Sequence, residues 1–172
     1  LHGREHSFPT RRSSDLFTLK DLPRIAEFCR RNNLKSYLTL NVVVYDNETS
    51  EVKKIVDSAI KNGISAIIAS DISVINYAAS KGMEVHLSTQ CNITNIEAIE
   101  FFSKYADTAV LARELTLDQI GQIYSEIRKR NICGPGGKLF RLEIFAHGAL
   151  CMAVSGKCYL SLHEYNKSAN RG

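Results

Sequence analysis

Residues 66–88 read AIIASDISVINYAASKGMEVHLS, and their pattern is the most informative about the architecture of the chain. An apolar run at 66–69 is followed by a helical stripe over 72–81, and a second apolar run covers 84–88. Short apolar runs on either side of a helix are typical of buried parallel strands joined by a crossover helix. Gly82 lies where the helix should end, because glycine easily takes the left-handed conformation of a helix C-terminus. The stretch therefore predicts one βα unit and the strand that follows it.

The same alternation continues in both directions along the chain. Apolar and β-branched content predicts strands at 37–44, 66–69, 84–88, 108–112 and 139–145. Helical periodicity predicts helices at 21–32, 52–60, 72–81, 95–105 and 116–127. Serial βα units indicate an α/β protein with a parallel sheet, either doubly wound or part of a (β/α)8 barrel. No GxGxxG turn or Walker loop follows a strand, which removes the main reason to choose the doubly wound sheet.

Length and composition narrow the class of protein. A complete barrel takes about 250 residues, so the 172 residues of this chain would hold only part of one. The chain has no apolar run near the roughly 18 residues that span a bilayer and no apolar secretory region at its start, so we expect a cytoplasmic protein without a membrane segment. The net charge of +4 permits a nucleic-acid partner, although no dense stripe of Lys and Arg demonstrates one.

The first sixteen residues differ from the rest of the chain. The segment His6–Leu16, HSFPTRRSSDL, resembles the translation of a sequencing adapter and lacks apolar periodicity. The alternative is a genuine basic arm that binds RNA. We expect residues 1–16 to be non-native and residues 17–172 to be a partial barrel domain that is truncated at both ends.

Polar residues follow the predicted strands, and in barrels the carboxyl ends of the strands carry the chemistry. They are Asn41, Asp71, Ser88, Gln90, Asn92, Arg113, Glu114, Glu143 and His147. Asp71 and Asn92 can alternatively start loops and cap helices, and Arg113 with Glu114 can form a local ion pair. Glu143 lies within an apolar strand, so its carboxylate faces either the barrel mouth or a polar layer.

The five cysteines lie at positions 29, 91, 133, 151 and 158. An odd number in a cytosolic chain favours free, metal-binding or catalytic thiols over a disulfide framework. Six residues separate Cys151 from Cys158, which is not the CxxC spacing of common metal sites. The spacing alone leaves metal ligation and buried core thiols as alternatives.

Residues 143–161 carry a resemblance to a known family. The pattern Glu-x-Phe-x-x-Gly-Ala-Leu-Cys, four residues, then Gly-x-Cys-x-Leu-Ser, resembles the signature of peptidase family U32, the collagenase-like peptidases. Further segments that are similar to the family are YLTLN at 37–41, IIASD at 67–71, HLSTQ at 86–90 and LAREL at 111–115. The resemblance implies a TIM-like (β/α)8 barrel, of which this chain would contain about strands three to seven.

The resemblance also implies a cofactor and residue roles. Hydroxylase members of the family hold a [4Fe–4S] cluster with four cysteines, and Cys151 and Cys158 match the first two. The remaining ligands would lie outside this chain, which alone would be inactive. From their positions at the strand ends, we expect Arg113, Glu114, Glu143 and His147 to be catalytic residues. We expect Asn41, Asp71, Ser88, Gln90 and Asn92 to bind the substrate.

Three classes of function follow. The resemblance implies oxygen-independent hydroxylation of the wobble uridine of tRNA with prephenate as hydroxyl donor, and relatives acting on ribosomal RNA or a ubiquinone precursor share the signature. A collagenase-like peptidase is the alternative, with Cys151 and His147, or Ser88 and His86, as nucleophile and base. No GxSxG or HExxH motif supports it. An RNA-binding module without catalysis would leave the cysteines unexplained. Homo- or hetero-oligomers remain open.

Overall fold

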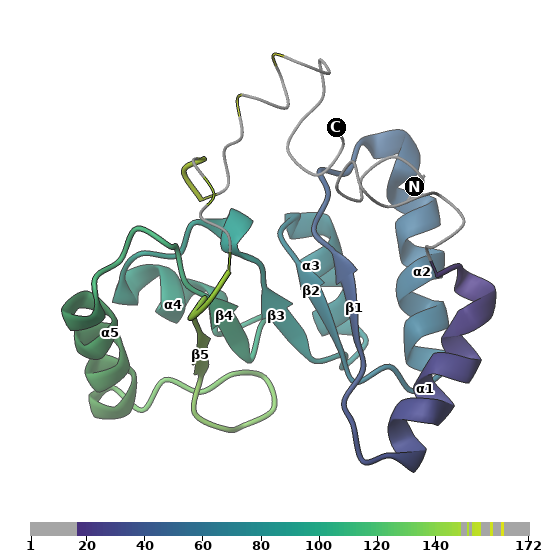
Figure 1. Cartoon of the computed structure of the whole chain (residues 1–172), viewed down its shortest axis with the longest axis horizontal. Coiled ribbons are helices and arrows are strands. Elements are labelled where there is room, and N and C mark those ends of the chain that lie inside the picture. The colour runs from purple at the N-terminus through teal and green to yellow at the C-terminus, as the bar shows by residue number, and fades with distance from the viewer. Residues whose placement is uncertain (1–16, 149–150, 152, 156–158, 160–162, 164–172) are drawn as a thin grey trace.

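The computed structural model describes residues 17–148, 151, 153–155, 159 and 163 (Figure 1). Its five-stranded parallel sheet consists of β1 (Tyr37–Leu40), β2 (Ala66–Ala69), β3 (Val85–Leu87), β4 (Thr108–Val110) and β5 (Arg141–Glu143). The helices are α1 (Leu22–Arg31), α2 (Thr49–Lys61), α3 (Ile72–Ser80), α4 (Ile96–Phe102) and α5 (Leu117–Lys129). Short 3-10 turns are η2 (Leu19–Asp21), η3 (Asp46–Glu48) and η4 (Thr89–Cys91). The predicted α/β class with serial βα units is confirmed.

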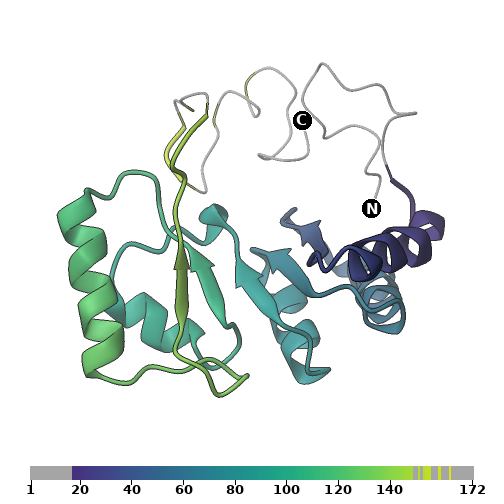
Figure 2. The ribbon, with the colours of Figure 1, turned by 60° about the horizontal axis from the view of Figure 1, so that its bottom comes forward.

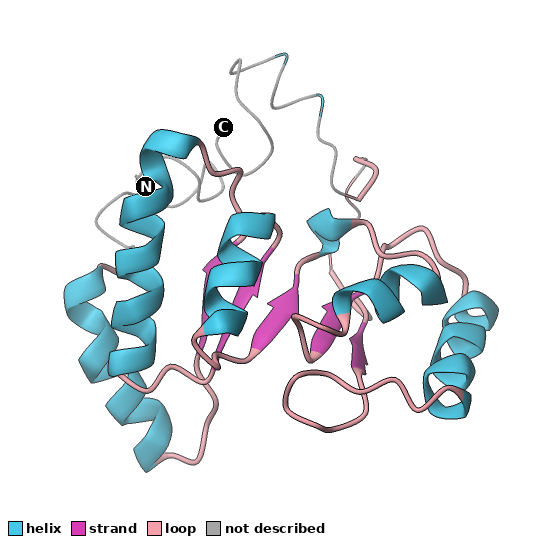
Figure 3. Ribbon diagram, turned by 180° about the vertical axis from the view of Figure 1, so that it is seen from behind, coloured by secondary structure: helices cyan, strands magenta, loops and turns pink. Residues whose placement is uncertain are grey.

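The strands pair in chain order, β1-β2-β3-β4-β5, and every pair is parallel. A doubly wound sheet reverses its strand order at a switch point, and this sheet has no such reversal. Right-handed crossovers that always step to the next strand place their helices on one face. Figure 3 shows α3 and α4 over the back of the sheet, and Figure 2 shows a curved sheet with helices around its outside. This open sheet is compatible with part of a TIM-like barrel.

Alternation along the strands divides the sheet into two faces. The helix-covered face holds the apolar core, which includes Ile67, Ala69, Val85, Leu87 and Ala109, each 0% exposed. The register of the ladders assigns the intervening residues to the opposite face, which we call the uncovered face. Its residues include Tyr37, Thr39, Ile68, His86, Thr108, Val110, Arg141 and Glu143. The core is therefore one-sided, and polar side chains collect on the other side.

Local signals in the sequence explain the helix bounds. Thr116 and Gln119 form the predicted capping box at the start of α5. Asn95 caps α4 by accepting a hydrogen bond from the backbone amide of Ala98. Gly82 follows α3 with a φ of +73°, which is the left-handed conformation expected there. Within the described part of the chain, no helix is long and apolar enough to cross a membrane.

Four strands, β1, β3, β4 and β5, are shorter than predicted, and β1 and β5 differ most. The prediction extended β1 to Val44, but its pairing ends at Leu40, opposite the last residue of β2. Beyond that point the backbone amide of Val44 donates to the carboxylate of Asp71 instead of to a strand. The prediction also began β5 at Leu139, which forms an isolated antiparallel bridge with Cys133. The apolar sequence thus extends beyond the residues that pair with a neighbouring strand.

Candidate functional site at the carboxyl edge of the sheet

Parallel pairing brings the carboxyl ends of the strands to one edge of the sheet, and the predicted polar residues follow those ends. Asn41 follows β1, Asp71 follows β2, and Ser88, Gln90 and Asn92 follow β3. Arg113 and Glu114 follow β4, Glu143 ends β5, and His147 lies four residues further on. The prediction that Asn41, Gln90, Arg113, Glu143 and His147 share one rim agrees with this arrangement. Contacts then join most of them into two separate networks.

The first is a neutral network of Asn41, Ser70, Ser88 and Gln90. Asn41 Nδ2 lies 3.4 Å from Ser88 Oγ, which also accepts from the backbone amide of Gln90 at 3.5 Å. Ser70 Oγ lies 3.1 Å from the carbonyl oxygen of Asn41 and 3.0 Å from Gln90 Oε1. The network therefore connects the turns after β1, β2 and β3. Ser70 was not predicted, because an isolated serine at a strand end gives no signal in the sequence.

Cys91 lies beside the neutral network, at the end of η4. Its Sγ atom is 3.8 Å from the carbonyl oxygens of Ala69 and Ser70. Burial raises the pKa of the Cys91 thiol to about 11, against a smaller opposing effect of a backbone hydrogen bond from Ser88. The thiol is therefore protonated at neutral pH and is not a nucleophile there.

Asp71 and Asn92 have local structural roles. Asp71 Oδ1 accepts from the amide and hydroxyl of Ser73 at 2.9 and 2.6 Å, which caps α3. Its other oxygen accepts from the amide of Val44 at 3.1 Å. Asn92 is exposed and takes the left-handed conformation, with φ 50° and ψ 47°, at the end of η4. The alternative given by the sequence, capping and turn formation, accounts for both positions, and substrate binding by them stays a prediction.

The second is a charged network of Arg113, Glu114, Cys151 and Ser155. The backbone amide of Arg113 donates to Ser155 Oγ at 3.1 Å, and its guanidinium donates to the same oxygen at 3.5 Å. The guanidinium also donates to the carbonyl oxygen of Ala153 at 2.8 Å. Glu114 Oε1 accepts from the backbone amide of Ser155 at 2.8 Å. Arg113 and Glu114 therefore hold Ala153 and Ser155 against the carboxyl end of β4.

This arrangement places Cys151 in an electropositive environment. The hydrogen bond from Arg113, followed by one from the backbone of Ala153, holds the pKa of the exposed Cys151 thiol below its usual range. The backbone hydrogen bond from Ser155 is the largest of the causes that lower the pKa of Glu114. A thiol near a cation ionises readily, and the thiolate is the form that binds a metal.

The donor chemistry of Cys151 therefore fits one ligand of an iron–sulfur cluster. Its predicted companion, Cys158, lies outside the described residues. Among the residues that the structure describes, no three His, Cys, Asp or Glu side chains approach closely enough to hold a metal ion. A four-cysteine site would therefore draw its other ligands from Cys158 and from chain not described here.

From the sequence, His86 was considered only as a base for Ser88. The structure places it between two glutamates instead. It is 2% exposed on the uncovered face. His86 Nε2 lies 2.9 Å from Glu84 Oε1, and Nδ1 lies 3.1 Å from Glu143 Oε1. Its position between Val85 and Leu87 could have indicated this, since alternation turns a polar residue between two core residues away from the core. The partnership with Glu143 depends on the fold.

Neither nucleophile and base pair proposed for a peptidase is formed in the described part of the chain. Ser88 Oγ bonds within the neutral network, and the nitrogens of His86 face two glutamates. No hydrogen bond joins the exposed His147 to Cys151 among the described residues. Activation of a serine or cysteine nucleophile requires such a bond with its base.

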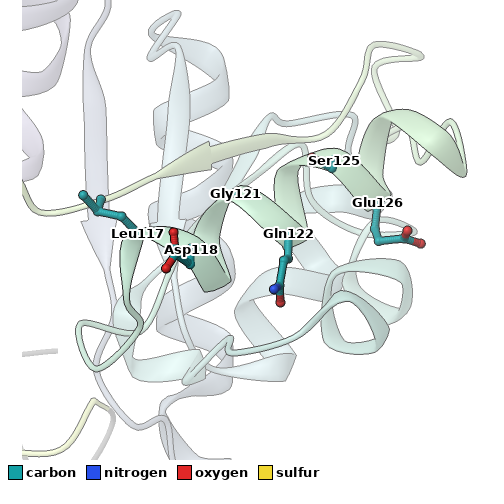
Figure 4. A pocket seen from close by; sticks show the side chains of 6 residues that line it. All are labelled: Leu117, Asp118, Gly121, Gln122, Ser125 and Glu126. Carbon is teal, nitrogen blue, oxygen red and sulfur yellow. The ribbon is translucent and has the colours of Figure 1, made fainter.

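A surface hollow on α5 lies apart from both networks (Figure 4). All six of its lining residues come from that one helix: Leu117, Asp118, Gly121, Gln122, Ser125 and Glu126. One face of a single helix does not surround a ligand, and binding sites are usually concave and enclosed by several elements. We therefore place the candidate site at the carboxyl edge.

A parallel α/β sheet with polar side chains at its carboxyl edge and an exposed thiol beside an arginine has the features of an enzyme domain. The model of peptidase family U32 matches residues 3–172. The chain therefore belongs to peptidase family U32, as the motif at 143–161 predicted.

Relatives in this family carry different names. A collagenase of Porphyromonas gingivalis is 58% identical over 161 residues, covering 94% of this chain and 39% of that protein. The 23S rRNA 5-hydroxycytidine synthase of Escherichia coli is 35% identical over 156 residues, covering 90% of this chain and 22% of that protein. The tRNA hydroxylation protein P1 of Bacillus subtilis is 28% identical over 175 residues, covering 100% of this chain and 38% of that protein. The chain thus spans less than two fifths of each of these relatives.

Proposed function

We propose that the protein containing this chain is a cytoplasmic iron–sulfur enzyme that hydroxylates the wobble uridine of tRNA, with prephenate as hydroxyl donor. The observation that carries the proposal is the charged network, which holds Cys151 at the carboxyl edge beside Arg113. An arrangement that favours the thiolate suits a metal ligand. Relatives named for the hydroxylation of tRNA and of ribosomal RNA support RNA as the class of substrate.

Each network has a part in this proposal. A bound iron–sulfur cluster supplies electron-transfer chemistry that side chains lack. Arg113 hydrogen-bonds toward the Cys151 sulfur and compensates its negative charge, while Glu114 fixes the backbone of the cysteine segment through Ser155.

The neutral network supplies the groups that we assign to substrate binding. Asn41 and Gln90 carry side-chain amides, which donate and accept hydrogen bonds and suit the edge of a nucleobase. Asn41 lies after β1 and Gln90 lies in the turn after β3, so a base on this edge would meet both. Glu143 ends β5 at the same edge and is the candidate acid or base.

A collagenase-like peptidase is the second candidate, and the 58% identity with a protein named collagenase favours it. This function would make Cys151 a nucleophile and His147 its base. No hydrogen bond joins these two side chains among the described residues, so the pair is not assembled there. The two candidates make opposite predictions for Cys158, which a peptidase does not need.

Replacing the cysteines one at a time in the intact protein, purified without air, separates the candidates. We expect Cys151→Ala and Cys158→Ala each to lose bound iron and tRNA hydroxylation, because loss of one ligand destabilises the whole cluster. Cys29→Ala is the matched control, since Cys29 lies on α1, away from the family motif, and should keep both. Iron per protein, hydroxyuridine in tRNA by mass spectrometry, and gelatin hydrolysis are the three measurements.

Wild-type iron content in Cys151→Ala and Cys158→Ala would end the cluster assignment. Gelatin hydrolysis that is lost in Cys151→Ala, retained in Cys158→Ala and insensitive to iron chelation would establish the peptidase. Iron-dependent hydroxylation of ribosomal RNA or of a quinone precursor, with tRNA unmodified, would keep the cluster and replace the substrate.

A further inference from the structure

His86 is a buried titratable residue that the proposed function leaves without a role. It lies on β3 between Val85 and Leu87, whose side chains enter the apolar core on the helix-covered face. Its own ring lies on the uncovered face, against the ring of Tyr37 at a centroid distance of 4.9 Å. At 2% exposure, the imidazole needs protein partners for both nitrogens, because burying an unpaired polar atom is costly.

One ring nitrogen has a well-defined partner. His86 Nε2 forms a 2.9 Å contact with Glu84 Oε1, and Arg141 of β5 hydrogen-bonds to the same oxygen. Burial opposes ionisation of Glu84, but the hydrogen bonds from His86 and Arg141 outweigh it and hold the pKa of Glu84 below its usual range. An ionised carboxylate only accepts hydrogen bonds, so Nε2 must carry a proton.

The other nitrogen faces the carboxyl edge. His86 Nδ1 lies 3.1 Å from Glu143 Oε1, although the two are not aligned as a hydrogen bond, and Nδ1 has no hydrogen-bond partner among the described residues. Thr108 Oγ1, on the adjacent strand in register with His86, is likewise buried and unpaired there. The side chain of Glu143 is 44% exposed, so it reaches from the buried ring to the edge of the sheet.

We propose that His86 is a positioning residue for Glu143, holding its carboxyl group at the carboxyl edge and sharing one proton with it. Because Nε2 is already protonated, a neutral ring would offer Nδ1 as an acceptor to a protonated Glu143. A protonated ring would instead donate from Nδ1 to an ionised Glu143. In both arrangements the pair, whose facing atoms are 3.1 Å apart, holds one proton. It is available to whatever group contacts the exposed side of Glu143.

Charged and titratable groups around His86 come from three strands. Glu84 lies immediately before β3, Arg141 and Glu143 lie on β5, and the phenol ring of Tyr37 packs on His86 from β1. Two carboxylates and one guanidinium therefore surround the imidazole. Arg141 binds Glu84, and Glu143 is the carboxyl group that faces Nδ1.

Two substitutions at His86 separate its two contacts in the full-length enzyme. The amide nitrogen of His86→Asn occupies about the position of Nδ1, and that of His86→Gln occupies about the position of Nε2. We expect His86→Gln to lower kcat for RNA hydroxylation roughly tenfold or more, with KM and iron content unchanged, because Glu143 loses its partner. His86→Asn should retain more of kcat but lose the pH dependence that the shared proton produces. Thr108→Val, of equal volume and without a hydroxyl, should keep wild-type kcat.

The activity readout depends on the proposed function, so a second measurement is independent of it. Full-length protein labelled with ¹⁵N-histidine reports the protonation of both ring nitrogens by NMR, with His86→Asn identifying the signal. We expect Glu143→Gln to move the Nδ1 resonance of His86 and its titration while Nε2 stays protonated. An unmoved Nδ1 resonance, or wild-type kcat and pH profile in His86→Gln, would overturn the inference. Absent hydroxylation in the wild type with a responsive Nδ1 would reject the proposed function alone.

Discussion

The neutral network and the charged network lie at the same edge of the sheet, but they connect different parts of the chain. The neutral network joins turns after β1, β2 and β3, which are already neighbours in the sheet. The charged network instead reaches about 40 residues along the chain, from Arg113 and Glu114 to Ser155. The neutral network therefore reinforces the sheet, and the charged network attaches the segment that contains Cys151 to it.

Their electrostatics differ in the same way. Uncharged amides and hydroxyls in a partly buried setting bond to one another, which contributes mainly to stability. Arg113 and Glu114 are exposed, where ion pairs and charges add little to stability. Damage to the neutral network should therefore lower the stability of the protein, whereas damage to the charged network should release the proposed cofactor.

The largest effect is expected from Arg113→Ala in the intact, iron-loaded protein. Loss of the guanidinium removes the bonds to Ala153 and toward the Cys151 sulfur, while the backbone amide at 113 still binds Ser155. Removing such a supporting residue typically weakens metal binding about 10–100-fold. The free energy of unfolding should change by less than about 0.5 kcal/mol, because the side chain is exposed.

The rate of iron release to a chelator, measured beside a thermal melt, tests this prediction. Arg113→Lys is the control, because lysine keeps the positive charge but lacks the guanidinium that contacts both Ser155 Oγ and the carbonyl oxygen of Ala153. Its rate of iron release should lie between the rates of wild type and Arg113→Ala. Equal iron release from Arg113→Ala and wild type would show that the charged network does not serve the cofactor.

A smaller effect is expected from Ser70→Ala, and it should appear in the stability of the protein and not in iron release. The substitution leaves Gln90 Oε1 and the carbonyl of Asn41 without the Ser70 hydroxyl, at a cost of about 1 kcal/mol in the free energy of unfolding. Iron release should not change. Ser80→Ala is the matched control, because its hydroxyl makes an exposed bond to Tyr77 within one helix and should cost less than about 0.5 kcal/mol. Faster iron release with unaltered stability would reverse the comparison.

The two networks also differ in how far the sequence could predict them. Strand centres and helices follow from periodicity and capping residues, so the positions of Asn41, Gln90 and Arg113 at strand ends were predictable. The limits of the strands were not predictable. Val42, Val43 and Val44 are apolar, but they follow Leu40, which pairs with the last residue of β2. Pairing partners, which end a strand, are a property of the fold.

Contacts between distant residues were the other missing information. Arg113 and Glu114 were predicted as a local ion pair or as catalytic groups, and their shared partner Ser155 carries no motif of its own. His86 reaches Glu143 across β4, which lies between their strands. Spacing in the sequence cannot show that contact, because it depends on strand order and on which face each side chain takes.

The last effect, absent at neutral pH, concerns the thiol of Cys91 beside the neutral network and that of Cys151 in the charged network. Burial raises the pKa of Cys91 to about 11, whereas Cys151 is exposed beside Arg113. Above the ordinary thiol pKa of about 8.5, the unfolded chain loses its Cys91 proton before the folded chain does. The thiol therefore contributes no pH dependence below about pH 8.5, and stability falls by up to about 1.4 kcal/mol per pH unit above it, until the folded thiol also ionises. Cys91→Ala lacks this slope, so the difference in unfolding free energy between wild type and variant should narrow from pH 8 to pH 10. A difference that stays constant over that range would show that Cys91 is not buried as a neutral thiol.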